Sequence, residues 1–143
     1  MTSKIIQIKT VNNEEKWIPK LRNENSSVYT LFARISKQQS LHQGEFIKIP
    51  TGVILHMPDG YVAQIYPKPG LSATGVIAVP MLIGSEFKEE IEVVLTLQKW
   101  AEYDTSFQYL KLLRDHFYPV IPGSEVAEIE FKKIDEINLK IIK

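Results

Sequence analysis

Residues 49–71 of this chain are Ile-Pro-Thr-Gly-Val-Ile-Leu-His-Met-Pro-Asp-Gly-Tyr-Val-Ala-Gln-Ile-Tyr-Pro-Lys-Pro-Gly-Leu. Two apolar runs in this segment, 53–57 and 61–66, are separated by Pro58-Asp59-Gly60. The proline presets φ and the glycine supplies φ > 0, as a tight turn requires. The segment therefore predicts a β-hairpin.

Further short apolar runs lie on both sides of the hairpin, and several alternate with polar residues, as strands with one buried face do. They are residues 4–11, 28–36, 45–49, 76–79, 91–97 and 126–131, and the tail 134–143 is left open as one more strand. Pro50 is expected to end the run 45–49. The segment from 80 to 90 is expected to be a hairpin turn or a strand with a wide turn. Strands this short and frequent predict an all-β sandwich or barrel.

Two segments lack this alternation. Residues 12–27 predict a long loop pinned by Trp17, Ile18 and Leu21. Within residues 100–118, an N-cap cluster at 104–106 precedes apolar residues at helical spacing, namely Phe107, Leu110, Leu113 and Phe117. The pattern predicts one short inserted helix that ends before Pro119. This helix either packs on the barrel or binds a partner.

Length and composition narrow the function. A chain of 143 residues fits one domain, residues 1–143, and its 17 basic and 17 acidic residues balance, so no net field favours nucleic acid. The absence of cysteine excludes disulfides and cysteine chemistry. No apolar run is long enough to span a bilayer, and the N-terminus lacks a signal-peptide pattern. We therefore expect a cytoplasmic protein that binds neither membrane nor nucleic acid.

The hairpin and the residues after it resemble the trimeric dUTPase family in order and spacing, through residues 49–53, 57–65 and the second motif at 67–71. Weaker resemblances follow the family order: residues 29–33 are similar to its first motif, 84–91 to its third and 123–128 to its fourth. The glycine-rich fifth motif, which closes over the phosphates, is absent from the tail. The resemblance implies a jelly-roll-like β-barrel that forms a homotrimer with ligand sites between subunits.

At the family's nucleotide-binding positions, most of the polar groups have changed. The first motif's Asp is replaced by Thr30, and the Arg and Ser of the second motif by Lys68 and Pro69, which Gly70 follows. In the third motif, the position of the water-activating Asp is Gly84 and that of the stacking Tyr is Phe87, which could stack on a ligand or simply pack. In the fourth motif, the Asp, Arg and Gln positions become Ser124, Glu125 and Glu128. The two glutamates either repel a triphosphate or are ordinary surface residues.

The remaining residues do not supply another catalytic site. Glu86 lies two residues from Gly84, but on a strand it would be displaced by about 7 Å, so we do not expect it to replace the missing base. The three histidines, His42, His56 and His116, lack the spacing of a metal site or a catalytic triad. We therefore expect no catalytic residue, no metal site and no cofactor.

These losses predict a catalytically inactive, dUTPase-like homotrimer that acts as a binding, regulatory or structural module, with an unidentified protein partner left open. The alternative is an active deoxynucleotide pyrophosphatase in which Glu86, Glu125 or Glu128 carries Mg²⁺. A barrel with no nucleotide history is a third interpretation.

Overall fold

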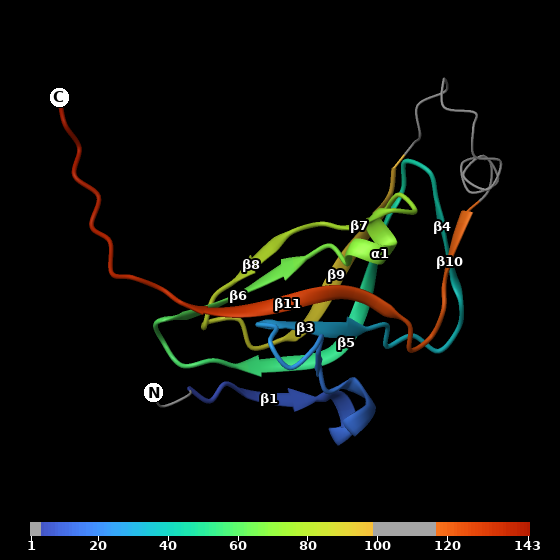
Figure 1. The fold of residues 1–143 in the computed structure, drawn as a ribbon, viewed down its shortest axis with the longest axis horizontal. Coiled ribbons are helices and arrows are strands. Elements are labelled where there is room, and N and C mark those ends of the chain that lie inside the picture. Colours follow the sequence, from blue (N-terminus) through green and yellow to red (C-terminus); the bar gives the residue numbers. More distant parts are fainter. Residues whose placement is uncertain (1–3, 99–116) are drawn as a thin grey trace.

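The fold is known from a computed structural model that describes residues 4–98 and 117–143. Two antiparallel sheets, with strand orders β2-β3-β11-β6-β8 and β1-β5-β9-β7, are accompanied by the two-stranded ribbon β10-β4 (Figure 1). The strands are β1 (Gln7–Thr10), β2 (Lys20–Leu21), β3 (Val28–Phe32), β4 (Gln39–His42), β5 (Phe46–His56), β6 (Tyr61–Tyr66), β7 (Val76–Ala78), β8 (Met81–Ile83), β9 (Glu90–Leu97), β10 (Phe117–Val120) and β11 (Glu125–Lys133). The helical turns are η1 (Val11–Asn13), η2 (Glu15–Trp17) and α1 (Pro69–Ser72). The all-β prediction is confirmed.

The core lies between the two sheets. Strands with alternating sequences turn one set of side chains inward, so that fully buried residues from both sheets form one apolar cluster. Its members include Leu31, Ile65 and Ile129 from the five-stranded sheet and Leu55, Val93 and Leu95 from the four-stranded sheet. This cluster holds fixed the strands whose outer faces carry the polar residues of interest.

The predicted hairpin is present, but β5 is longer than expected. Gly60 has φ +89° in the turn before β6, as the sequence predicts. Pro50 does not end the strand: β5 continues through it, and its register against β9 shifts between Pro50 and Ile54. The prediction was wrong here because a proline fits a bulge, where no ladder hydrogen bond is lost.

The bulge also explains how the 12–27 loop is held. Gly52 has φ +77°, and a Cβ at this position would lie 2.5 Å from Cγ of Trp17. Trp17 therefore packs directly on the bulge and is 6% exposed, so its predicted anchoring role is confirmed. Ile18 and Leu21, in contrast, are 45% and 41% exposed and do not pin the loop.

Between β7 and β9, the chain crosses to the other sheet. β7 pairs with β9 as a hairpin would, but β8 pairs with β6 in the five-stranded sheet. No strand is predicted at β2, β4 or β8, because segments of two to four residues are too short to display a clear period. The consequence for the site is that residues 84–89 follow β8 near the start of β6, whereas α1 follows the end of β6.

The predicted inserted helix lies largely outside the described residues. Its last predicted residue, Phe117, is instead the first residue of β10, which runs through Pro119 and pairs with β4. The tail 134–143 forms no strand in this chain and leads away from the sheets (Figure 1). Among the helices of the described part of the chain, none is long and apolar enough to cross a membrane.

Candidate functional site

Three neighbouring strands bring Thr30, Tyr66 and Glu128 to one level of the five-stranded sheet. Glu128 on β11 is directly opposite Thr30 on β3 and Tyr66 on β6. Directly opposed residues project to the same face of a sheet, so these three side chains are neighbours. Thr30 is 5% exposed and Glu128 is fully buried. The interpretation of Glu128 as a surface glutamate is therefore wrong.

The buried carboxylate of Glu128 is neutralised by Arg22, which follows β2. Nε of Arg22 donates to Oε2 of Glu128 over 2.7 Å, and Nη2 donates to Oε1. The hydrogen bond to Glu128 raises the pKa of Arg22 above its ordinary value. Bidentate pairing satisfies both carboxylate oxygens, which is what allows a charge to be buried at this point.

A second ion pair lies beside the first. Lys68 immediately precedes α1, and its Nζ is 3.0 Å from Oε2 of Glu125 on β11. The Lys68 side chain is only 22% exposed. We call Arg22, Thr30, Lys68, Glu125 and Glu128 the paired cluster, because each of its four charged groups has an opposite charge within the chain.

The other predicted residues near the paired cluster contribute no free polar group. Pro69 occupies the first turn of α1, where it removes a backbone donor. Gly70 is exposed in the same turn and has open space around it. The hydroxyl of Ser124 donates to the carbonyl of Ile121 over 2.7 Å and so stabilises its own turn.

Residues 84–89, which we call the Gly84 turn, hold a different arrangement. The N–H of Phe87 donates to the carbonyl of Gly84 over 3.2 Å, so the chain turns here instead of continuing as a strand. Glu86 is thereby folded back. A Cβ at Gly84 would contact Oε2 of Glu86 and would lie 2.6 Å from its Oε1. The expected displacement of about 7 Å is therefore wrong, and a carboxylate occupies the space beside Gly84.

Phe87 is partly exposed at the same turn. It borders a hollow of about 240 Å³ together with Met81, Ile83 and Ile91, so it combines a packing role with an accessible ring face. Ser85 links the turn to the β5–β6 hairpin, since its hydroxyl donates to Oδ1 of Asp59 over 3.1 Å. The turn is thus anchored to the hairpin on one side of Phe87.

Within a single chain, the paired cluster and the Gly84 turn are far apart. The β6–β8 register pairs Ala63 with Ile83, which places Gly84 near Val62, whereas Glu128 is opposite Tyr66. Four residues along a strand span about 13 Å. The predicted site residues therefore form two groups, at opposite ends of β6.

A polar network that the sequence did not predict lies next to the paired cluster. Lys132 donates from Nζ to the Tyr66 hydroxyl over 2.9 Å, and that hydroxyl donates to Oε1 of Gln64 over 2.9 Å. Glu130 accepts from Ser27, and this hydrogen bond is the main reason that its pKa is lowered. Alternation along β11 was the available signal, because it places residues 128, 130 and 132 on one face.

A family model of dUTPase matches residues 14–102. The chain belongs to the dUTPase family. It is 25% identical over 138 residues to the deoxyuridine 5'-triphosphate nucleotidohydrolase of Fusobacterium nucleatum, which covers 94% of this chain and 84% of that enzyme. The same enzyme of Rickettsia felis is 33% identical over 98 residues, 66% of each chain.

Solved dUTPase structures share the fold. The dUTPase from phage phi11 of S. aureus superposes with a TM-score of 0.76 at 16% identity, covering 98% of this chain and 97% of that one. The Staphylococcus bacteriophage 80alpha dUTPase superposes with a TM-score of 0.72 at 15% identity, and the match covers 97% of this chain and 96% of that one. Of those phage proteins it is known that phage dUTPases control transfer of virulence genes by a proto-oncogenic G protein-like mechanism.

In the paired cluster, neither carboxylate is left unpaired for the Mg²⁺ ion that dUTP hydrolysis requires. Mg²⁺ is bound through carboxylate and phosphate oxygens in near-octahedral geometry. The carboxylates of Glu125 and Glu128 are occupied by Lys68 and Arg22. Across residues 4–98 and 117–143, no three His, Cys, Asp or Glu side chains come together as a metal-binding group.

Proposed function

We propose that this dUTPase-family chain does not hydrolyse dUTP and acts as a homotrimeric binding or structural module. The observation that carries the proposal is the internal pairing of the site's cations, Lys68 with Glu125 and Arg22 with Glu128. In a working phosphate site, cations or amide donors are free to meet the phosphate oxygens. In this chain, carboxylates of the same chain are paired with the cations that would otherwise meet the phosphate oxygens.

A triphosphate would have to displace these carboxylates or bind beside them. Two unit charges 4 Å apart interact by about 4 kcal/mol at an effective dielectric near 20, and exposure to solvent reduces this figure. Glu128 cannot move to solvent, because it is fully buried. An incoming phosphate could therefore gain Arg22 only by leaving Glu128 as a buried, unpaired charge, and it would compete with Glu125 for Lys68.

Assembly as a trimer is part of the proposal. The paired cluster and the Gly84 turn lie at opposite ends of β6 in one chain, so only different copies could bring them together. Closed cyclic symmetry is the usual outcome of such association. Light scattering is expected to give three times the mass of one chain, 16.4 kDa. A stable monomer at micromolar concentration would contradict this part of the proposal.

A pyrophosphate-release assay with dUTP and Mg²⁺ tests the lack of hydrolysis. The expected result is no enzyme-dependent release above background. Losing a positioned base costs about 10²–10⁴ in rate, and losing a phosphate donor costs a further factor of about 10²–10³. Turnover of about 1 s⁻¹ or more, a typical enzyme rate, would overturn the proposal.

One observation favours a second candidate, an active pyrophosphatase with a relocated base. The carboxylate of Glu86 fills the space beside Gly84, where the family has an Asp side chain. If the chain does release pyrophosphate, Glu86→Gln should abolish release, because an amide cannot accept the proton of an attacking water. Glu89→Gln is the matched control, since Glu89 is exposed in the same turn but is not beside Gly84. Equal activity of both variants would exclude Glu86 as the base.

A further inference from the structure

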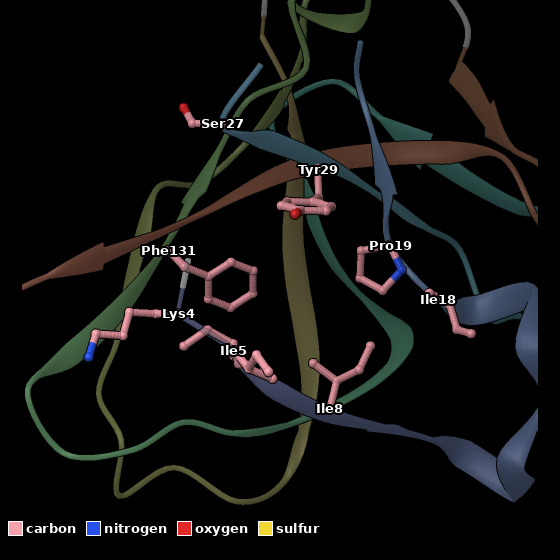
Figure 2. A pocket seen from close by; sticks show the side chains of 9 residues that line it. Lys4, Ile5, Ile8, Ile18, Pro19, Ser27, Tyr29 and Phe131 are labelled. Carbon is pink, nitrogen blue, oxygen red and sulfur yellow. The ribbon is translucent and has the colours of Figure 1, made fainter. Parts of the chain in front are cut away.

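Two hollows in the described part of the chain differ in charge. The first is a groove of about 530 Å³ between the N-terminal strand and the five-stranded sheet, and its lining is mainly apolar, with Ile5, Ile8, Tyr29 and Phe131 beside one cation, Lys4 (Figure 2). The second hollow, of about 630 Å³, is lined by three cations and by no carboxylate. Only the second hollow has a lining that would select a ligand by its charge.

The cations of the second hollow, which we call the cationic hollow, come from separate segments. Lys16 lies in η2, Arg34 follows β3, and Lys37 lies in the connection between β3 and β4. The N–H of Arg34 donates to the carbonyl of Pro50 over 2.7 Å, so the chain after β3 is held against the β5 bulge. Pro50 lines the hollow as well. Packing at the bulge therefore gathers charges that are distant in the sequence.

Two of these cations already have a carboxylate partner, but each partner lies outside the lining of the hollow. Nζ of Lys16 is 3.1 Å from Oε2 of Glu14. Nε and Nη2 of Arg34 donate to Glu90 over 2.7 and 2.8 Å. These bonds leave Nη1 of Arg34 unused, because a guanidinium carries five N–H donors. The charge of Glu92 also acts on Arg34, and Glu92 is likewise absent from the lining.

Other donors of the cationic hollow have no partner. Within residues 4–98 and 117–143, the ammonium of Lys37 makes neither an ion pair nor a hydrogen bond, and the side chains of Ser36 and Gln39 make no hydrogen bond. Trp17 lines the same hollow, and its buried Nε1–H has no acceptor in that part of the chain. Buried donors are nearly always satisfied, so an unsatisfied one indicates a missing acceptor. The hollow thus offers donors and lacks acceptors.

Phosphate is the anion that this set of donors favours. A phosphate monoester carries nearly two negative charges and three acceptor oxygens, so it can meet several cations and neutral donors at once. Arginine and lysine are the residues that usually bind it, through charge-assisted hydrogen bonds. A carboxylate has one charge and two oxygens, and it would leave more of these donors without a partner.

We propose that the cationic hollow binds a phosphate group, with Lys37 and Nη1 of Arg34 as its charged donors and Ser36 and Gln39 as its neutral donors. No member of the paired cluster lines this hollow, so the site is separate from the one that dUTP would occupy. The inference is therefore independent of whether dUTP is hydrolysed. A free polyphosphate and a phosphorylated peptide present the same group, and the experiment distinguishes these two sources.

Binding is measured by calorimetry on the full chain with two probes, inorganic tripolyphosphate and a glycine peptide that contains one phosphoserine. Trp17 gives a second signal, because Trp100→Phe leaves it as the only tryptophan. At least one probe is expected to bind saturably, and the tighter of the two identifies the source of the phosphate. If neither probe binds with a Kd below about 1 mM, the proposal is overturned.

Lys37→Gln tests whether the probe occupies the cationic hollow. The variant removes an exposed cation that has no partner, so folding should be unaffected, while the Kd of the bound probe should rise about tenfold. Lys133→Gln is the matched control: it makes the same charge change at an exposed position at the end of β11 and should leave the Kd nearly unchanged. An equal loss of affinity in both variants would show attraction by overall charge and would overturn the proposal.

Lys68→Gln separates the cationic hollow from the paired cluster. A probe bound at the paired cluster would lose affinity in Lys68→Gln and keep it in Lys37→Gln, which would also overturn the proposal. The opposite pattern is expected. Neither variant requires an assay of hydrolysis, so this result and the proposed lack of turnover are judged separately.

Discussion

The charged side chains at the two ends of β6 differ in their burial and in whether they are paired with an opposite charge. In the paired cluster, each charged side chain meets an opposite charge, and Glu128 is completely enclosed. In the Gly84 turn, Glu86 is exposed and its carboxylate lies against a glycine. The first arrangement contributes to folding and leaves few groups for a ligand, whereas the second contributes little to folding and leaves a carboxylate accessible.

This contrast separates structural roles from chemical ones. A buried charge must be paired with an opposite charge, so replacing one partner of the pair should lower stability more than replacing an exposed charge does. An exposed carboxylate can be changed with little effect on stability. The following variants test whether the two ends of β6 differ in this way.

Arg22→Met should have the largest effect. It leaves the enclosed Glu128 without its cation, and a buried charge that loses its partner is strongly destabilising. The expected fall in Tm is on the order of 10 °C, measured by circular dichroism. Lys20→Met, an exposed neighbour on β2, is the control and should leave Tm nearly unchanged. An unchanged Tm for Arg22→Met would mean that the pair contributes nothing to the fold.

Replacing Glu125 and Glu128 together by Gln should release two cations while keeping side-chain size. The expected gain in affinity for dUTP with Mg²⁺ is about tenfold, equivalent to about 1.4 kcal/mol, and it should shrink as salt increases. Calorimetry at two salt concentrations measures it. Glu89→Gln with Glu92→Gln makes the same charge change outside the paired cluster. An equal gain in that control would indicate a general charge effect.

Glu90 is the first residue of β9, directly after the Gly84 turn, and its ion pair with Arg34 can be tested through the pH dependence of stability. Burial alone would raise the pKa of Glu90, but hydrogen bonds from Arg34 and from the N–H of Gly52, with the charge of Arg34, lower it overall. A folded-state pKa below the unfolded value means that this stabilisation is complete above about pH 4.5 and is lost as the pH falls through the lowered pKa.

Glu90→Gln should therefore destabilise the protein by about 1 kcal/mol at pH 7, because the group is partly exposed, and by progressively less below pH 4. Urea unfolding at pH 7 and at pH 3 measures the difference. A loss of stability that is equal at both values would contradict the role of the Arg34 pair.

Gly84→Ala should have the smallest effect. The added Cβ meets the Glu86 carboxylate, which is the end of a flexible exposed side chain and can move away. The backbone at Gly84 does not have the positive φ that would disfavour alanine. The expected change in the free energy of unfolding is within about 0.5 kcal/mol. A large destabilisation would show that the Glu86 carboxylate is held firmly, which would strengthen its candidacy as a base.

Much of the framework follows from local sequence. The alternation along residues 126–131 predicted a strand, and Pro58-Asp59-Gly60 predicted a hairpin turn; the structure contains both. Both could be predicted because alternation and a positive φ depend only on residues that are adjacent in the sequence. The dUTPase motifs identified the family for the same reason, since they are contiguous. The prediction that Thr30 and Gly84 replace acidic residues of the family likewise rests on sequence alone.

What only the tertiary structure decided is which charges meet. Arg22 and Glu128 are 106 residues apart, and Lys68 meets Glu125 only because β6 and β11 pair. Glu86 reaches Gly84 because the chain turns there, whereas a period-two pattern assumes that it continues straight. Composition and spacing determine which groups are present and which strands can form. The pairing of distant strands determines whether each charge is free for a ligand or neutralised within the fold.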